Sequence, residues 1–98
     1  MEEIKKNWFI YTTEEINPTR KMLFEKIEIK AVISQSWVSM DYIKRAVAFS
    51  TREQALIYLY QYIKPFTTTD KFSRMNVVEL DTTYIDNVNE CLFTFKSE

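Results

Sequence analysis

The 98 residues fit one domain, and a hydrophobic share of 46% with 15% aromatic residues is above that of disordered chains. The 13 basic and 14 acidic residues give a net charge of −1, which does not favour strong non-specific binding to nucleic acid. The chain has no histidine, no glycine and one cysteine, which excludes the usual zinc ligand sets, histidine-dependent nucleophiles and glycine-rich phosphate loops. We therefore expect no enzyme, cofactor or metal.

The first half of the chain predicts strands. Residues 1–7 are charged and are expected to fray, and Trp8 to Thr13 predicts a strand rich in aromatic and β-branched residues. After a turn at Asn17-Pro18, apolar and polar residues alternate from Met22 to Ile33, which predicts one long half-buried strand. The stretch from Trp37 to Phe49 favours a strand at both ends, but its charged middle leaves open one bent strand or two pieces.

A helix is predicted next, from about Thr51 to Lys64. Ser50 followed by Glu53 matches a capping box, and Pro65 cannot extend a helix. Between them, apolar side chains recur at the spacing of a buried helical stripe, which comprises Ala55, Leu56, Leu59, Tyr60 and Ile63.

Two more strands are predicted after the helix. Residues 66–74, with three consecutive threonines, predict an exposed loop, and strands follow from Met75 to Asp81 and from Cys91 to Lys96. The order β-β-β-α-β-β predicts a single α+β domain over residues 1–98, in which a mainly antiparallel sheet of about five strands carries one helix on a face.

Two side chains with chemical potential have plain structural interpretations. Glu25 interrupts the apolar face of Leu23 and Ile27, where a buried carboxylate could transfer protons. We instead expect Glu25 at the sheet margin, reaching water or a lysine, because acids are rarely buried. Cys91 should act as a small buried hydrophobe.

The cellular setting is predicted from three features. A lone cysteine forms no internal disulfide, and the N-terminus lacks the layout of a secretory signal. The longest apolar runs, residues 46–49 and 55–60, are far shorter than the roughly 20 residues that cross a bilayer. We expect a cytoplasmic protein without a membrane partner.

Charge is unevenly distributed along the chain. The net charge is −2 over residues 1–19, +5 over residues 20–74 and −4 over residues 79–98. The middle segment could present a basic face that attracts phosphates or an acidic protein, or it could pair with the acidic C-terminal region. The basic face would comprise Lys26, Lys30, Lys44, Arg45 and Arg52.

The segment Arg45–Ala55 resembles the third strand and following helix of an RNA-recognition motif. The resemblance implies that Phe9 and Tyr11, on the first strand, stack on bases. The family pattern has a glycine and a second aromatic residue where Ala46 and Ala48 stand, and a helix between its first two strands. Nucleic-acid binding is therefore an alternative function, with phosphate contacts from Lys44, Arg45 and Arg52.

The favoured prediction is a non-catalytic protein–protein interaction module. Tyr58 and Tyr62 flank the helical stripe, and tyrosine and tryptophan rings are frequent in protein interfaces, although these rings could also fill the core. Abundant Phe, Tyr, Ile, Asn and Lys favour an AT-rich genome, such as that of a phage or mobile element. A small inhibitor or adaptor of a host protein, for example a defence factor, is thus expected, and a self-assembling component or homodimer is the other alternative. The predicted partner-binding residues are Tyr58, Tyr62, Trp37, Lys44, Arg45 and Arg52.

Overall fold

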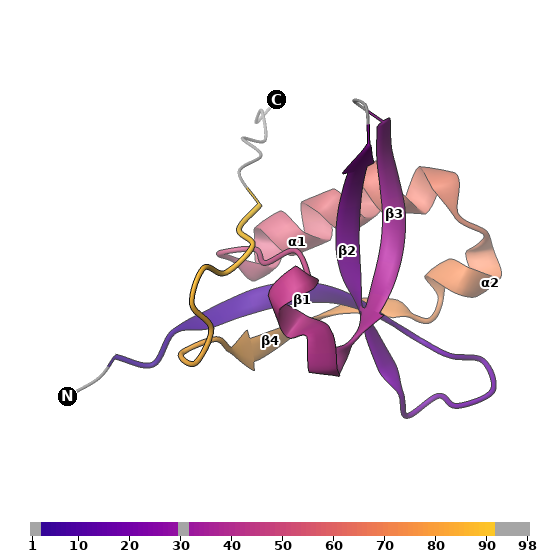
Figure 1. Ribbon diagram of the computed structural model, residues 1–98. Coiled ribbons are helices and arrows are strands. Elements are labelled where there is room, and N and C mark those ends of the chain that lie inside the picture. The colour runs from indigo at the N-terminus through magenta and orange to yellow at the C-terminus, as the bar shows by residue number, and fades with distance from the viewer. Residues whose placement is uncertain (1–2, 30–31, 92–98) are drawn as a thin grey trace.

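The computed structural model describes residues 3–29 and 32–91, and they contain a four-stranded antiparallel sheet in the order β3-β2-β1-β4 (Figure 1). The central strand β1 (Lys6–Thr13) pairs with β2 (Lys21–Ile29) and with β4 (Met75–Asp81), while β2 also pairs with β3 (Val32–Ser39). This arrangement confirms the predicted α+β fold and antiparallel sheet. The described residues form four named strands, however, where about five were predicted.

The two halves of the sheet separate beyond a short shared segment. β1 pairs with β2 only from Tyr11↔Leu23 to Thr13↔Lys21, after which β2 and β3 leave β1 and β4 at a steep angle (Figure 1). Residues 46–49 fill the gap between β1 and β2: Phe49 exchanges two backbone hydrogen bonds of 2.8 Å with Trp8, and the Val47 amide donates to Phe24 O at 2.9 Å. Residues 46–49 are all buried.

The helical segment after this insertion covers one face of the sheet. It begins with α1 (Arg52–Tyr58), widens into the π-helical turn η2 (Leu59–Ile63) and ends in the 3-10 turn η3 (Lys64–Phe66), which confirms the predicted helix within two residues. Its buried side chains pack on one core cluster, made of Ile10, Phe24, Val47, Phe49, Ala55, Tyr58, Leu59 and Ile63.

A second core cluster lies on the opposite face, because neighbouring residues of a strand point to opposite sides. Its buried members are Phe9, Leu23, Val38, Ala46 and Ala48. Ile43, from the 3-10 segment η1 (Met40–Arg45), and Val88 pack against this cluster. Cys91 is partly buried and packs against the first cluster.

Two strand predictions in the first half need correction. The predicted strand from Met22 to Ile33 is two antiparallel strands, because Ile29 pairs with Val32. No glycine, proline or asparagine marks the change of direction, so the alternation gave no sign of it. The stretch from Trp37 to Phe49 is two pieces: β3 ends at Ser39, and η1 separates it from the bridges at Ala48 and Phe49.

Smaller differences concern the segment ends. Residues 66–74, predicted as a loop, contain the short helix α2 (Thr69–Phe72), where Thr68 Oγ1 accepts a hydrogen bond from the Lys71 amide at 3.2 Å. β1 begins at Lys6, two residues before the start of the predicted strand at Trp8. The last predicted strand, Cys91 to Lys96, lies outside the described residues except for Cys91.

Candidate protein-binding site

Glu25 is buried and paired with Arg45, which corrects the prediction that it lies at the sheet margin. Its side chain is 9% exposed, and Oε1 accepts a hydrogen bond from Arg45 Nε at 2.8 Å. The other carboxylate oxygen, Oε2, is buried without a hydrogen-bond partner in the described part of the chain. Arg45, at the end of η1, contacts Glu25 on β2 although the two residues are 20 positions apart in sequence. Residue spacing does not reveal such a contact.

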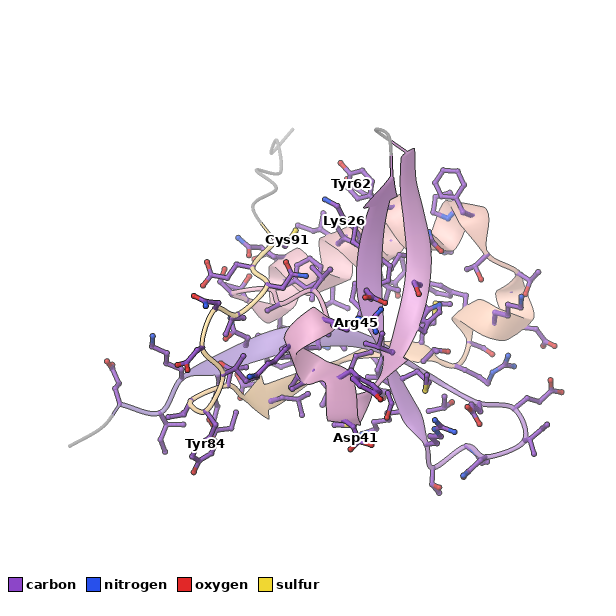
Figure 2. The ribbon with its side chains drawn as sticks, viewed as in Figure 1. Lys26, Asp41, Arg45, Tyr62, Tyr84 and Cys91 are labelled. Atoms are coloured by element: carbon purple, nitrogen blue, oxygen red, sulfur yellow. The ribbon has the colours of Figure 1, made fainter. Side chains whose placement is uncertain are left out.

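The predicted basic face is therefore only partly present. Arg45 directs its guanidinium to Glu25, and Figure 2 shows it beside β2. Lys44 is exposed next to it on η1, and Arg52 is exposed at the start of α1. Neither Lys44 nor Arg52 forms an ion pair with a described residue. Lys30 lies outside the described residues.

Of the two aromatic residues expected to stack on bases, Phe9 is in the core and Tyr11 is partly exposed. Phe9 is buried within the second core cluster, so its ring cannot reach a base and this prediction was wrong. Tyr11 is half-buried, and Lys21 Nζ lies 4.9 Å from its ring centroid. In addition, residues 14–20 between β1 and β2 contain no helix, unlike an RNA-recognition motif.

Three of the predicted aromatic residues belong to one series of ring contacts. The Tyr58 ring centroid lies 5.5 Å from that of Phe24 and 5.0 Å from that of Tyr62. The Trp37 ring contacts Phe24 edge-on, at a centroid distance of 5.6 Å. Tyr58 is only 4% exposed, and burial, followed by the nearby Cys91 and Tyr62, raises its pKa to about 12. Tyr58 is thus a core residue and is withdrawn from the partner-binding set, whereas Tyr62 is exposed.

Three further aromatic residues, two of them exposed, lie instead where the helical segment ends and in α2. Tyr60 is 52% exposed and Phe66 is 78% exposed. The Tyr60 and Phe72 rings meet edge-on at 5.4 Å, and Lys64 Nζ lies 5.3 Å from both ring centroids. We call Tyr60, Lys64, Phe66 and Phe72 the aromatic corner.

This group was not predicted from the sequence, for two reasons. Tyr60 was assigned to the buried helical stripe, but the π-helical turn η2 is wider than an α-helical turn and changes the angular position of the residues in it. Phe66 and Phe72 fell in a segment predicted as an exposed loop. Two phenylalanines within such a loop were the available signal, because large apolar side chains are uncommon there without a packing or binding role.

No family model, curated protein or solved structure matches this chain. Among the described residues, no helix combines the length and apolar character needed to cross a bilayer. The same part of the chain contains no group of three metal-ligating side chains.

Proposed function

We propose that this chain is a non-catalytic protein-binding module that contacts its partner through the aromatic corner. The observation that carries the proposal is the exposure of Tyr60 and Phe66, 52% and 78%, at the end of a helical segment whose other side is buried. Aromatic side chains provide large contact areas with little loss of rotamer freedom, and they dominate the binding energy of many interfaces.

Lys64 adds a defined charge to this surface. Its ammonium group lies at the same distance, 5.3 Å, from the rings of Tyr60 and Phe72, within the range of cation–π attraction. Such contacts hold the long side chain against the rings and reduce the rotamer entropy that it would lose on binding. The surface thus fits an apolar patch with an acidic residue at its border.

The module is proposed to act as an inhibitor or adaptor on a larger cytoplasmic host protein, for example a defence factor, and to derive from a phage or mobile element. The residue composition, which favours AT-rich codons, supports this origin. The single cysteine, which cannot form an internal disulfide, supports a cytoplasmic setting.

The test compares two exposed aromatic regions of the same chain. Wild-type protein captures its partner from host lysate, and the purified partner is titrated with wild type, with a Tyr60→Ala/Phe66→Ala double variant and with Tyr84→Ala. Tyr84 is 87% exposed but lies in the segment after β4, on the opposite side of the view from α2 (Figures 1 and 2). We expect the double variant to bind at least tenfold more weakly, and Tyr84→Ala to stay within about twofold of wild type.

Equal affinity of the double variant and wild type would refute the assignment of the aromatic corner. The alternatives give different outcomes. A self-assembling protein shows a molar mass that rises with concentration in light scattering. Nucleic-acid binding gives an affinity that falls steeply with salt and weakens in Lys44→Gln and Arg52→Gln, because phosphate contacts release counterions.

A further inference from the structure

A pocket of about 420 Å³ opens where β1 ends and β4 begins. Thr12 and Met75 are paired there across β1 and β4, and both line the pocket. Trp37 contributes from β3, and Lys71 and Arg74 contribute from α2 and the turn after it. The volume lies within the range of roughly 300–1,000 Å³ that is usual for small-molecule sites.

Arg74 is held in place at this pocket by two backbone carbonyl groups from different segments. Its Nε donates to Thr13 O at 3.2 Å, and its Nη1 donates to Asp70 O at 3.3 Å. No carboxylate of the described residues pairs with the guanidinium, and Nη2 has no hydrogen-bond acceptor among them. A fixed guanidinium with unused N–H groups is prepared for an anionic group, because little side-chain freedom remains to be lost.

The other charged groups of the pocket leave a positive excess. Glu14 forms an ion pair with Arg20, whose Nη1 lies 3.5 Å from Glu14 Oε1. Lys71 and Glu15 form no ion pair with a described residue. Two unpaired cations, Lys71 and Arg74, therefore face one unpaired carboxylate, and the pocket favours a ligand with a net negative charge.

The remaining wall supplies apolar contact area. Trp37 is half-buried, and its ring is fixed by an edge contact with Phe24 at a centroid distance of 5.6 Å. Met75 and Ile16 lie on the same pocket, and a thioether adapts readily to an aromatic ring. An indole held by the core can receive another ring without moving.

We propose that this pocket binds a small molecule in which an aromatic ring is joined to one anionic group, a carboxylate or a phosphate. The ring lies against Trp37 and Met75, and the anion accepts hydrogen bonds from Arg74 and Lys71. This site is separate from the aromatic corner, so a partner protein is not needed to occupy it.

The experiment titrates the purified chain with a panel of probes by NMR. The panel contains benzoate, indole acetate, adenosine monophosphate and uridine monophosphate, so carboxylates and phosphates are compared directly. Matched controls carry only one part: indole and adenosine lack the anion, while acetate and inorganic phosphate lack the ring. The readouts are the indole N–H signal of Trp37 and the Nε–H signal of Arg74, assigned with Trp37→Phe and Arg74→Lys.

We expect at least one two-part probe to shift both signals in a saturable manner, at least tenfold more tightly than either of its halves. Lys71→Gln should weaken that binding by roughly tenfold, the usual effect of losing one charge-assisted hydrogen bond. Lys71 is exposed and its side chain makes no hydrogen bond or ion pair with a described residue, so this variant tests binding without disturbing the fold. Lys44→Gln, a change of equal charge on η1, should bind like wild type.

Three outcomes would overturn the proposal. The first is that no member of the panel binds with a Kd of about 1 mM or tighter. The second is that indole or adenosine binds as well as its charged counterpart, which means that the cations do not contribute. The third is that Lys71→Gln and Arg74→Lys both bind like wild type. None of these results depends on Tyr60 or Phe66, so the two proposals fail independently.

Discussion

Replacing Arg45 by methionine should destabilise the fold more than its exposed position implies. Arg45 is 57% exposed, but its Nε is the hydrogen-bond donor, at 2.8 Å, to a Glu25 side chain that is 9% exposed. In the Arg45→Met variant neither Glu25 oxygen has a protein donor, since Oε1 loses Arg45 Nε and Oε2 already has none among the described residues. An unsatisfied buried polar group costs about 1–3 kcal/mol, and a fully buried unpaired charge costs about 3–5 kcal/mol.

The exposure of Arg45 places this case in the lower of the two ranges. Water can enter where the arginine side chain stood, so we expect the free energy of unfolding to fall by about 2 kcal/mol. For a domain of this size each kcal/mol lowers Tm by about 4–8 °C, which gives a decrease of roughly 8–16 °C.

The converse substitution should have a much smaller effect. In Glu25→Met the remaining Arg45 can turn its guanidinium to water, and the methionine adds apolar area beside Leu23. We expect a change within about 1 kcal/mol in either direction, and the Glu25→Met/Arg45→Met double variant should resemble Glu25→Met alone. The two single variants are thus predicted to differ although they break the same ion pair.

Urea unfolding monitored by circular dichroism measures this asymmetry, with Lys44→Met as the control from the same η1 segment. Lys44 has no ion pair among the described residues, and its replacement should change the free energy of unfolding by less than about 0.5 kcal/mol. The reasoning is refuted if Arg45→Met is as stable as Lys44→Met, or if Glu25→Met is the less stable member of the pair. Either result would mean that water already satisfies the Glu25 carboxylate.

Three further predictions concern individual residues. Burial raises the pKa of Tyr58 from 10.0 to about 12, so the unfolded chain releases this proton first and the free energy of unfolding should fall between those pH values. Urea titrations at increasing pH should show a smaller fall for Tyr58→Phe than for wild type. An equal fall would contradict the assignment. Thr51 Oγ1 accepts a hydrogen bond from the Gln54 amide at 3.1 Å. In urea unfolding, Thr51→Ala should therefore lower the free energy of unfolding by about 1 kcal/mol and Ser50→Ala by less than about 0.5 kcal/mol. The reverse order would identify Ser50 as the helix cap. Asn87 has a φ of 63°, so Asn87→Ala should lower Tm by several degrees more than Asn87→Gly, and equal values would exclude a left-handed backbone there.

The parts of the fold that depend on neighbouring residues could be predicted from sequence. The strand from Met75 to Asp81 agrees with β4, and the predicted helix from Thr51 to Lys64 agrees with the segment from α1 to η3. Both predictions rest on periodicity and on end signals such as Pro65, which act within a few residues. The helix cap shows the limit of this reasoning, because Thr51 rather than Ser50 accepts the hydrogen bond from the Gln54 amide.

The Glu25–Arg45 pair could not be predicted in the same way. Alternation correctly placed Glu25 on the face of Leu23, but burial of that face depends on η1 and on residues 46–49 returning to β2. The prediction that Glu25 reaches a lysine or water came from the average behaviour of acidic residues. The actual environment of Glu25 is set by its contact with Arg45, 20 positions away in sequence. Single-sequence patterns contain no information on such a contact.

Both proposed binding surfaces depend on residues 66–74, whose structure was poorly predicted from the sequence. Residues 66–74 were predicted as an exposed loop, yet Phe72 joins the aromatic corner and Arg74 faces the pocket. The Arg74 guanidinium reaches Thr13 O across 61 positions, and this bond ties the segment to the end of β1. A loop tied down by a long-range bond can hold side chains in a fixed arrangement without using the core, which is the usual position of binding residues on a rigid scaffold. Loosening this bond in Arg74→Lys should therefore affect the pocket directly, and the aromatic corner only to the extent that Phe72 changes position.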